Sequence, residues 1–511
     1  MPVFFWGLGR YGVVNGDEAI YHAIAERMVA TGDWLRLDFR GEPRFYDSFM
    51  NAPLHYFARA ALIELFGSGR WTMRVLSAAA GAATVLATAG LAARQAGSRA
   101  ALLAGLVQLS TFQFVWLHGA RTGELDALAT LLFVGIAWLF LRAALDGRSF
   151  VPHHLALIAL AWTKLPLVLV PLAVEAGHFA ASSRARPRLR AYLVSGAALA
   201  PLALSWHAVQ LALWWDQVPA VAARMWGQAS GAVPDSEYVG RLDNAMFYLR
   251  TLAWGAFPWS AALPFALLAA LREPRLRALL AWPLALGVFF ALVAKHYPWY
   301  VLPATPFFAI ALGSWLAELP RRAAPALASL AAASVVATLL CVDATPANPL
   351  AEVALVYPMR ARLAGALGAP ALVAGAAGAV LAAGAMLAAQ RRGGRAREVA
   401  GFALGHALVA TAAWRGALPL RQLGHQSELD LLRAALDRAR AAGQPIEFPV
   451  RVPPGSPQIA RFLFGEDFEI EARATPAGTT LWLQPKGDPA VLGRSIGRLG
   501  LERRLARPAD P

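Results

Sequence analysis

Long apolar stretches recur along most of this chain, and they constrain its fold more than any other feature does. A helix needs roughly 17 to 25 apolar residues to cross the hydrocarbon core of a bilayer. Stretches of about that length include residues 100–117, 127–145, 191–213 and 278–294. Of the 511 residues, 58% are hydrophobic and only 15% are charged, whereas a soluble domain carries about 25% charged residues. The sequence therefore predicts an all-α polytopic membrane protein.

The cationic residues follow a pattern that is typical of membrane proteins. The formal net charge is +15, which in a soluble protein would suggest nucleic acid as a partner, but the arginines fall in short clusters between the apolar spans. Such clusters mark the inner side of a membrane, so we expect no nucleic-acid partner. Cys341 is the only cysteine, and one chain therefore contains neither a disulfide nor a cysteine-based metal site.

The arginine clusters predict the topology, because all of them should lie on the inner side of the membrane. This condition is met if residues 1–70 lie outside and about twelve membrane segments follow, each long enough to span the bilayer. The predicted segments are 72–92, 100–117, 127–145, a helical pair within 154–180 interrupted at Thr163 to Pro166, 191–213, 252–271, 278–294, 299–318, 323–342, 362–389 and 399–416. The same parity places four polar segments on the outer side, namely 9–70, 117–126, 214–250 and 295–298.

A change in composition near residue 417 divides the chain into two predicted domains. Residues 1–416 form the transmembrane module, and residues 417–511 form a small α+β domain on the outer, extracytoplasmic side. Within the second domain, SELDLLRAALDRARAAG at 427–443 has helical periodicity. Three short segments, EFPVRV, EDFEIEARA and TTLWLQP, predict strands.

The first outer loop, residues 9–70, carries an adjacent pair of carboxylates. Asp17 and Glu18 precede a run in which apolar residues recur with helical spacing from Ile20 to Val29. We expect amphipathic helices here that lie along the membrane surface. The acidic pair is a candidate for catalysis; alternatively, Asp17 only caps the helix and Glu18 complements its dipole.

A second group of ionisable residues interrupts two predicted spans. His118, Arg121, Glu124 and Asp126 cluster at one membrane boundary, where ionisable groups are candidates for function. For Arg121, an ion pair that merely ties two helix ends together is the alternative.

Lysine is rare in this chain, which makes its few positions informative. The 47 lysines and arginines include only three lysines, at positions 164, 295 and 486. Lys164 and Lys295 stand at outer helix ends, and Lys295 is followed by Tyr297, Trp299 and Tyr300. Snorkelling to the interface explains a single such lysine but explains the aromatic cluster around it less well.

Several motifs, in this order, resemble the GT-C superfamily of membrane glycosyltransferases, most closely the branch with the aminoarabinose lipid A transferases and the dolichyl-phosphate-mannose protein mannosyltransferases. The resemblance covers about residues 10–310. It rests on GlyAspGluAlaIleTyr at 16–21, AsnAlaProLeuHisTyrPhe at 51–57, ArgThrGlyGluLeuAspAlaLeu at 121–128, ThrLysLeuPro at 163–166 and LysHisTyrProTrpTyrValLeuProAlaThrPro at 295–306.

This chain departs from the family pattern at two places. Family members have a transmembrane helix before the acidic pair, whereas only MPVFFWGL stands there, so we expect the first family helix to be truncated in this sequence. Asn51 replaces a common lysine, which removes a cation that could contact the donor phosphate and leaves the donor's identity open.

The resemblance implies attack on the anomeric carbon of a polyprenyl-phosphate sugar, with inversion. It implies a carboxylate base, for which Asp17 is the first candidate and Glu18 and Asp126 are the others. The groups implied at the donor phosphate are Arg121, Lys295, Tyr297, Tyr300 and Lys164. The groups implied to line the acceptor side or the cavity are Trp34, Asn51, His55, Tyr56 and His118. No cofactor is required, although the carboxylates do not exclude a divalent metal.

The function expected from these features is sugar transfer to lipid A or another envelope lipid at the outer face of a bacterial-type inner membrane. The expected partners are the polyprenyl-phosphate sugar, a lipid or glycan acceptor and membrane lipids. One alternative is a transporter or flippase, for which inverted repeats and helices broken at the midplane would be typical. A second is a protein O-mannosyltransferase. A purely structural scaffold would leave the clustered charges unexplained.

Overall fold

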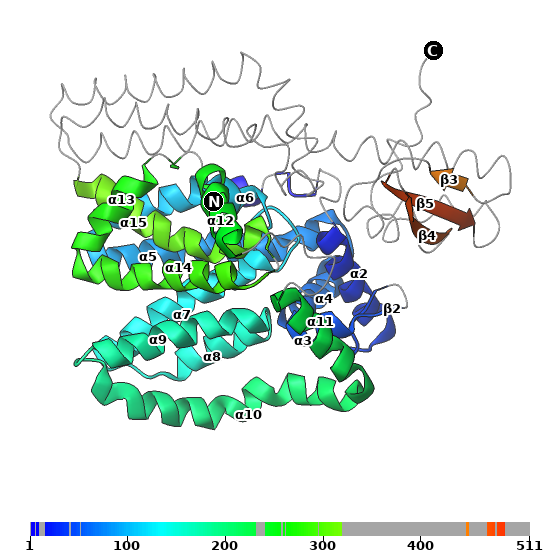
Figure 1. Ribbon diagram of the computed structural model, residues 1–511, viewed down its shortest axis with the longest axis horizontal. Helices are drawn as coiled ribbons and strands as arrows, with labels where there is room; N and C mark the ends of the chain where they lie inside the picture. The colour runs from blue at the N-terminus through cyan, green and yellow to red at the C-terminus, as the bar shows by residue number, and fades with distance from the viewer. Residues whose placement is uncertain are drawn as a thin grey trace, which may run out of the picture.

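The computed structural model describes a mostly helical chain. It covers residues 2–5, 7–9, 16–39, 42–51, 53–230, 241–256, 259–260, 262–294, 296–318, 446–448, 468–475 and 478–485. Within this part, six helical segments are long and apolar enough to cross a membrane: Arg70–Ser110, Asp126–Asp146, Val151–Ala181, Arg186–Leu213, Pro274–Leu292 and Pro298–Glu318. Figure 1 shows their helices running alongside one another in a bundle. The chain is thus a multi-pass membrane protein, as predicted, while the expected spans at 323–342, 362–389 and 399–416 lie outside the described residues.

The first long helix, α5 (Arg70–Ser110), is in fact a helical hairpin. Gly97 interrupts it with a left-handed φ of +86°, a conformation that glycine adopts without steric cost. A methyl group placed on Gly105 would lie 3.5 Å from Ala89 Cβ and 3.7 Å from Val85 Cγ1. The two halves therefore lie against each other, which confirms the predicted reversal between residues 92 and 100.

A second hairpin follows helix α7 (Asp126–Asp146). It consists of α8 (Val151–Ala161), the 3-10 turn η1 (Leu165–Val168) and α9 (Leu169–Ala181). His153 Nε2 on α8 lies 2.8 Å from Glu175 Oε1 on α9, so these helices pack together. The break predicted at Thr163 to Pro166 is confirmed, because α8 ends before Lys164 and Pro166 stands within the first turn of η1.

The later helices follow the predicted spans with one exception. The predicted spans 191–213, 278–294 and 299–318 correspond to α10 (Leu189–Leu213), α14 (Pro274–Leu292) and the 3-10 helix η4 (Pro298–Ala304) with α15 (Thr305–Glu318). The single span predicted at 252–271 is wrong, because α12 (Arg241–Gly255) ends within it and α13 (Leu263–Arg272) begins anew. Pro264 occupies the first turn of α13, where its missing N–H costs nothing. Helix α11 (Val218–Ser230) follows the short turn η3 (Trp215–Gln217) after α10.

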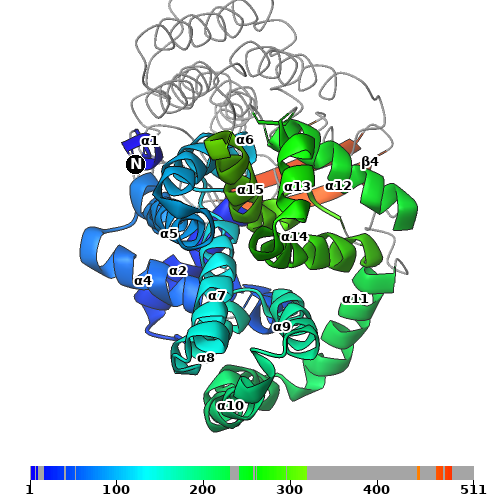
Figure 2. The same ribbon diagram turned by 90° about the vertical axis from the view of Figure 1, so that its left-hand side faces the viewer.

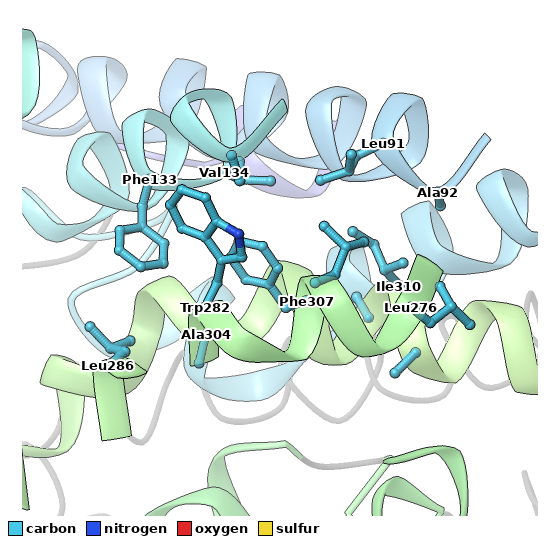
Figure 3. Close-up of a cluster of buried hydrophobic side chains, with 14 of the residues drawn as sticks. Leu91, Ala92, Phe133, Val134, Leu276, Trp282, Leu286, Ala304, Phe307 and Ile310 are labelled. Carbon is cyan, nitrogen blue, oxygen red and sulfur yellow. The ribbon is translucent and has the colours of Figure 1, made fainter. Parts of the chain in front are cut away.

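The bundle core forms between α5, α7, α14, η4 and α15. Trp282 is stacked on Phe307, with ring centroids 6.0 Å apart and planes 4° apart, and Phe133 meets both rings edge-on. Figure 3 shows these three rings together, with Leu91, Val134 and Ile310 nearby. Aromatic pairs in such geometries contribute about 0.5–1.5 kcal/mol beyond their burial. This packing fixes α7 relative to α14 and α15.

The two ends of α7 carry different chemistry. At its last residue, Asp146 Oδ1 accepts a hydrogen bond of 2.8 Å from Arg94 Nη2, and nearby Arg188 Nη2 donates to the Arg148 carbonyl. At its first residue, Asp126 Oδ1 accepts a hydrogen bond from Lys164 Nζ. Since 21 helical residues are about 30 Å long, the arginine-rich turns lie at the opposite end of the bundle from Asp126.

The short elements between residues 16 and 66, within the segment predicted to form the first outer loop, gather at one end of the bundle (Figures 1 and 2). They are α2 (Gly16–Thr31), the two-residue strands β1 (Asp38–Phe39) and β2 (Glu42–Pro43), α3 (Phe45–Met50) and α4 (Leu54–Phe66). Pro53 precedes α4 as its N-cap residue. Two shorter helices, α1 (Pro2–Phe5) and α6 (Phe112–Trp116), complete this part.

The described residues beyond 417 form a three-stranded antiparallel sheet. Its strands are β3 (Ile446–Phe448), β4 (Phe468–Thr475) and β5 (Gly478–Pro485), in the order β3-β5-β4. Phe468 pairs with Pro485 and Thr475 with Gly478, so β4 and β5 form a hairpin. Three predicted strand segments are confirmed in part or in full, while the helix predicted at 427–443 lies outside the described residues.

We expect Gly313→Ala to destabilise the protein, because α15 and α5 meet there backbone to backbone. A methyl group on Gly313 would lie 2.4 Å from the Ala104 nitrogen and 2.8 Å from the Ala100 carbonyl oxygen, and overpacking of this kind costs about 1–3 kcal/mol. Thermal unfolding of the purified protein measures the effect. Gly135→Ala on α7 is the matched control, since a methyl group there meets nothing within 4 Å. Equal melting temperatures for the two variants would contradict this account.

Candidate active site

Helix α2 is buried on nearly every side, although the sequence predicts an amphipathic helix. Residues 18–25 are all less than 8% exposed. The reason is that α2 packs against α4, with the Tyr21 ring 5.6 Å from Tyr56 and 5.4 Å from His55, and also meets the loop 117–125 through Glu18. Apolar periodicity alone did not reveal this second partner.

Glu18 is the centre of a buried ion pair. Its carboxylate accepts hydrogen bonds from Arg74 Nε at 2.6 Å and Nη2 at 2.9 Å, and both side chains are completely buried. Glu18 Oε1 also accepts the Gly123 N–H at 2.9 Å. Bidentate arginine–carboxylate pairs fix geometry as well as charge, so Glu18 holds α2, α5 and the loop 117–125 together.

The Gly123 peptide is held from both sides. Arg59 Nη2 donates to the Gly123 carbonyl, opposite the bond from its N–H to Glu18, and Ser77 Oγ donates to the Glu124 carbonyl at 2.8 Å. A methyl group on Gly123 would lie 2.7 Å from Glu18 Cγ, so only glycine fits. Burial lowers the pKa of Arg59 to about 10, while Glu18 and Glu124 oppose that shift.

Asp126 contacts two basic side chains, one with each carboxylate oxygen. Its Oδ1 accepts a 2.6 Å hydrogen bond from Lys164 Nζ, and its Oδ2 lies 3.0 Å from His118 Nδ1. His118 Nε2 in turn lies 4.0 Å from Glu124 Oε1. All but Lys164 are buried. Asp126 therefore joins the loop 117–125 to the turn that follows α8.

Aromatic rings of the 297–300 segment lie over His118 and Lys164. The His118 and Trp299 rings are stacked 3.7 Å apart with planes at 4°, and Trp299 is stacked on Tyr297 at 4.6 Å. Lys164 Nζ lies 4.8 Å from the centre of the Tyr300 ring, a cation–π geometry. Three segments far apart in sequence thus meet at Asp126.

Asp17 lies within electrostatic range of the same groups. Burial raises the pKa of Tyr21 well above its usual value, and the carboxylates of Asp17, Asp47 and Asp126 raise it further. The Asp17 carboxylate acts in the same sense on the pKa of Tyr56 and of His118. The half-buried Asp17 therefore shares one electrostatic environment with Asp126.

Parts of the sequence are similar to those of known proteins. A model of the family "Dolichyl-phosphate-mannose-protein mannosyltransferase" matches residues 50–207. Undecaprenyl phosphate-alpha-4-amino-4-deoxy-L-arabinose arabinosyl transferase 2 of Pseudomonas fluorescens is 27% identical over 61% of this chain and 54% of its own length. The corresponding transferase 1 of Sodalis glossinidius is 27% identical over 58% of this chain and 54% of its own length.

Solved structures show the same fold. ArnT from Cupriavidus metallidurans bound to undecaprenyl phosphate superposes with a TM-score of 0.67 at 21% identity, covering 90% of this chain and 82% of that one. In the apo state it gives a TM-score of 0.61 at 20% identity, over 94% and 95% of the two chains. The chain has the fold of the GT-C superfamily, and its sequence is similar to those of aminoarabinose transferases. It spans about half the length of the two sequence relatives named above.

The structure of this GT-C chain brings most of the predicted site residues together. Around Asp126 lie four of them: His118, Lys164, Tyr297 and Tyr300. His55 and Tyr56 of α4 and Asn51, which caps the end of α3, lie around Tyr21. Arg121, 2% exposed, lies within the loop 117–125, and Lys295 lies outside the described residues.

Trp34 is set apart from this arrangement. Its indole meets the Phe57 ring edge-on at 5.6 Å, and Phe57 in turn meets Trp206 of α10. In the described parts of the chain, no group of three or more histidine, cysteine, aspartate or glutamate side chains is arranged to hold a metal ion.

Four charged residues of the GT-C site were missed by the sequence reasoning. Arg59 and Arg74 support the loop 117–125 from within apolar helices, and charged residues in apolar helices are a signal in themselves. Asp47 is bound by Arg44 Nε at 2.6 Å and by Asn51 Nδ2 at 2.8 Å. No local signal distinguishes Arg44 and Asp47 from the other charges of their loop.

We expect Glu18→Gln to lower the stability of the protein strongly. The substitution leaves Arg74 buried without its counter-ion, and breaking a buried pair in this way costs about 3–5 kcal/mol. Thermal unfolding of the purified protein is the measurement.

Arg94→Gln is the control, because it removes a charged pair whose side chains are 29% and 35% exposed. Exposed pairs contribute about 0–1 kcal/mol. If Glu18→Gln melted at the temperature of Arg94→Gln, the Glu18–Arg74 pair would not be the anchor of the loop.

Proposed function

We propose that this chain is a glycosyltransferase that moves a sugar from a polyprenyl-phosphate donor to a lipid acceptor, with inversion at the anomeric carbon. The observation that carries the proposal is the meeting of α2, the loop 117–126 and the segment 297–300 at one end of a GT-C bundle. Carboxylates of α2 and of the loop, the Lys164 side chain and the aromatic rings of the segment 297–300 lie close together there. The relatives named as undecaprenyl-phosphate aminoarabinose transferases support the donor class.

We assign the role of general base, or of the group that orients the acceptor, to Asp17. Of the three candidate carboxylates, Glu18 is bound to Arg74 and Asp126 is bound to Lys164 and His118. A carboxylate that binds cations is stabilised in its charged form and is a weak proton acceptor. Glu18 and Asp126 then act as positioning residues. Asp17, the first candidate from the family resemblance, lies within electrostatic range of Tyr21, Tyr56 and His118 and takes the proton of the attacking group.

The departing phosphate needs positive charge and hydrogen-bond donors in a site that excludes water. Arg121, Lys295, Tyr297 and Tyr300 are the groups we assign to this role. Lys164 donates a hydrogen bond to Asp126 and lies over the Tyr300 ring. Its role is therefore to balance the negative charge of Asp126 at the edge of the site. Arg121 is buried in the loop 117–125.

On the acceptor side we place Trp34, Asn51, His55, Tyr56 and His118. Lipid A or another envelope lipid is the acceptor class that we propose, because several relatives are aminoarabinose transferases. Protein O-mannosylation is the second candidate, and the description of the matching family favours it. Both reactions use a lipid-phosphate sugar and differ in the acceptor, so an acceptor panel separates them.

The site and residues 417–511 are proposed to face the outer side of an inner membrane, and the chain to have about twelve membrane segments of spanning length. The arginine-rich turns at residues 94–99, 142–148 and 184–190 support this orientation. They lie at the end of the bundle opposite to Asp126, and cationic loops mark the inner side.

The proposal is tested with purified protein, radiolabelled polyprenyl-phosphate sugars and a panel of lipid and peptide acceptors. Transfer to a lipid supports it, and transfer only to a peptide favours the O-mannosyltransferase. If no sugar is transferred but substrate is exchanged across liposomes, the chain is a transporter.

We expect Asp17→Asn to abolish transfer while donor binding persists. General bases contribute about 10²-fold to 10⁴-fold in rate, and the substitution keeps the size of the side chain. The turnover number in the radiolabel assay is the measurement, with donor binding measured separately. Asp33→Asn is the control, since the Asp33 side chain is 44% exposed. Normal turnover of Asp17→Asn would remove this residue from the role of base.

We expect Arg121→Gln to lower the turnover number by about 10²-fold to 10³-fold, the usual effect of removing one group that stabilises transition-state charge. The same assay measures it. Arg36→Gln serves as the control, because the Arg36 side chain is 60% exposed. A change in donor affinity alone, with unchanged turnover, would show that Arg121 binds the ground state and the transition state equally.

A further inference from the structure

His118 occupies an unusual backbone position. Among the described residues, it is the only one other than glycine with a positive φ, at +52°. Side chains with a Cβ atom adopt this left-handed region at a cost, and such strain persists only where surrounding contacts impose it. The contacts that impose it here are specific to the imidazole ring, since they use its Nδ1 atom and its flat face.

The ring is held by an acid on one side and by an aromatic face on the other. His118 Nδ1 lies 3.0 Å from Asp126 Oδ2. The ring is stacked on Trp299 at 3.7 Å, with planes only 4° apart. The loop 117–125 and the 297–300 segment are distant in sequence, and this stack is a direct contact between them.

We propose that His118 and Trp299 form a positioning pair that ties the loop 117–125 to the 297–300 segment and thereby sets the position of Asp126 and Lys164. The role rests on the proposed function, because Asp126 and Lys164 matter as parts of that site. Neither residue of the pair needs to touch the reacting atoms.

Protonation of His118 strengthens its contacts with Asp126 and Trp299, which together tie the loop 117–125 to the 297–300 segment. Burial lowers the pKa of His118, but the nearby carboxylates of Glu124, Asp126 and Asp17 outweigh it, and the net shift is upward. Lys164, on the far oxygen of Asp126, and Arg121, in the same loop, are the neighbouring cations. A positive ring binds Asp126 more strongly and stacks more favourably on the negative face of an indole.

The upward shift fixes the direction of the pH dependence. A group whose pKa is raised in the folded protein adds stability that is complete below its unfolded value, which is 6.5 here. That stability is lost as the pH rises through the folded value. Loosening of the tie is therefore an alkaline event, in the range above pH 6.5.

The experiment compares wild type with His118→Gln, Trp299→Leu and the double variant, using the full chain in detergent or lipid nanodiscs. Turnover number and donor KM are measured from pH 6 to 9, and the melting temperature is measured over the same range without substrate. His178→Gln is the matched control, because His178 lies on α9 at the opposite end of the bundle and contacts Phe140.

We expect His118→Gln to lower the turnover number by about 100-fold, the scale of a misplacement of 1 Å, with a smaller change in KM. Its turnover and melting temperature should lack the alkaline decline of the wild type. Trp299→Leu should move that decline to lower pH, since it removes the aromatic face. The double variant should lose less than the sum of the two single losses, because the residues act as one contact.

The outcomes separate the two proposals. If the wild type transfers sugar and His118→Gln keeps its turnover and pH profile, the positioning pair is overturned. If His118→Gln does not fold, Trp299→Leu decides, and an unmoved alkaline decline overturns the pair. If the wild type transfers no sugar, the proposed function fails. The melting temperatures then still decide whether the tie exists.

Discussion

The buried Glu18–Arg74 pair is the interaction on which the rest of the site depends. Two charges removed from water are tolerated only when their geometry is good and their remaining hydrogen-bonding atoms are satisfied. Here that condition is met by the bidentate contact, by the Gly123 N–H on Glu18 and by the Leu8 carbonyl on Arg74. The pair therefore specifies one arrangement of α2, α5 and the loop 117–125, because any other arrangement would expose a buried charge to an apolar surrounding.

The loop 117–125 leads directly into Asp126, the first residue of α7. Residues that position the loop and residues that we assign to the reaction therefore lie within a few positions of one another. Glu18 and Arg59 bind the two sides of the Gly123 peptide, and Asp126 follows three residues later. One carboxylate oxygen of Asp126 contacts Lys164, and the other contacts His118. Hydrogen bonds between charged and polar groups thus connect α2, the loop 117–125 and the turn after α8, in a part of the bundle where most of these side chains are buried.

The sequence was sufficient to predict the apolar spans, which recur along the chain, and the ionisable residues that interrupt them. The spans and hairpins were predictable because the length of apolar segments and the positions of cationic turns depend directly on the membrane. Lys164 and Asp126 were predictable because ionisable residues within or beside apolar spans are rare. The break between α12 and α13 was not, since an apolar run continues across it. Neither was the burial of α2, because a helix face that contacts lipid and one that contacts protein have the same composition. The partners of Glu18 lie 56 and 105 residues away, and nothing local encodes them.

The structure also distinguishes, by burial and by neighbouring side chains, carboxylates that the sequence alone does not distinguish. Asp17 and Glu18 are neighbours on α2, yet Glu18 is fully buried against an arginine while Asp17 is half-buried beside tyrosines. A carboxylate held by a guanidinium keeps its charge and its place, which suits a positioning role. Asp17 instead lies within electrostatic range of Tyr21, Tyr56 and His118, so two adjacent acids of one helix contact different parts of the site.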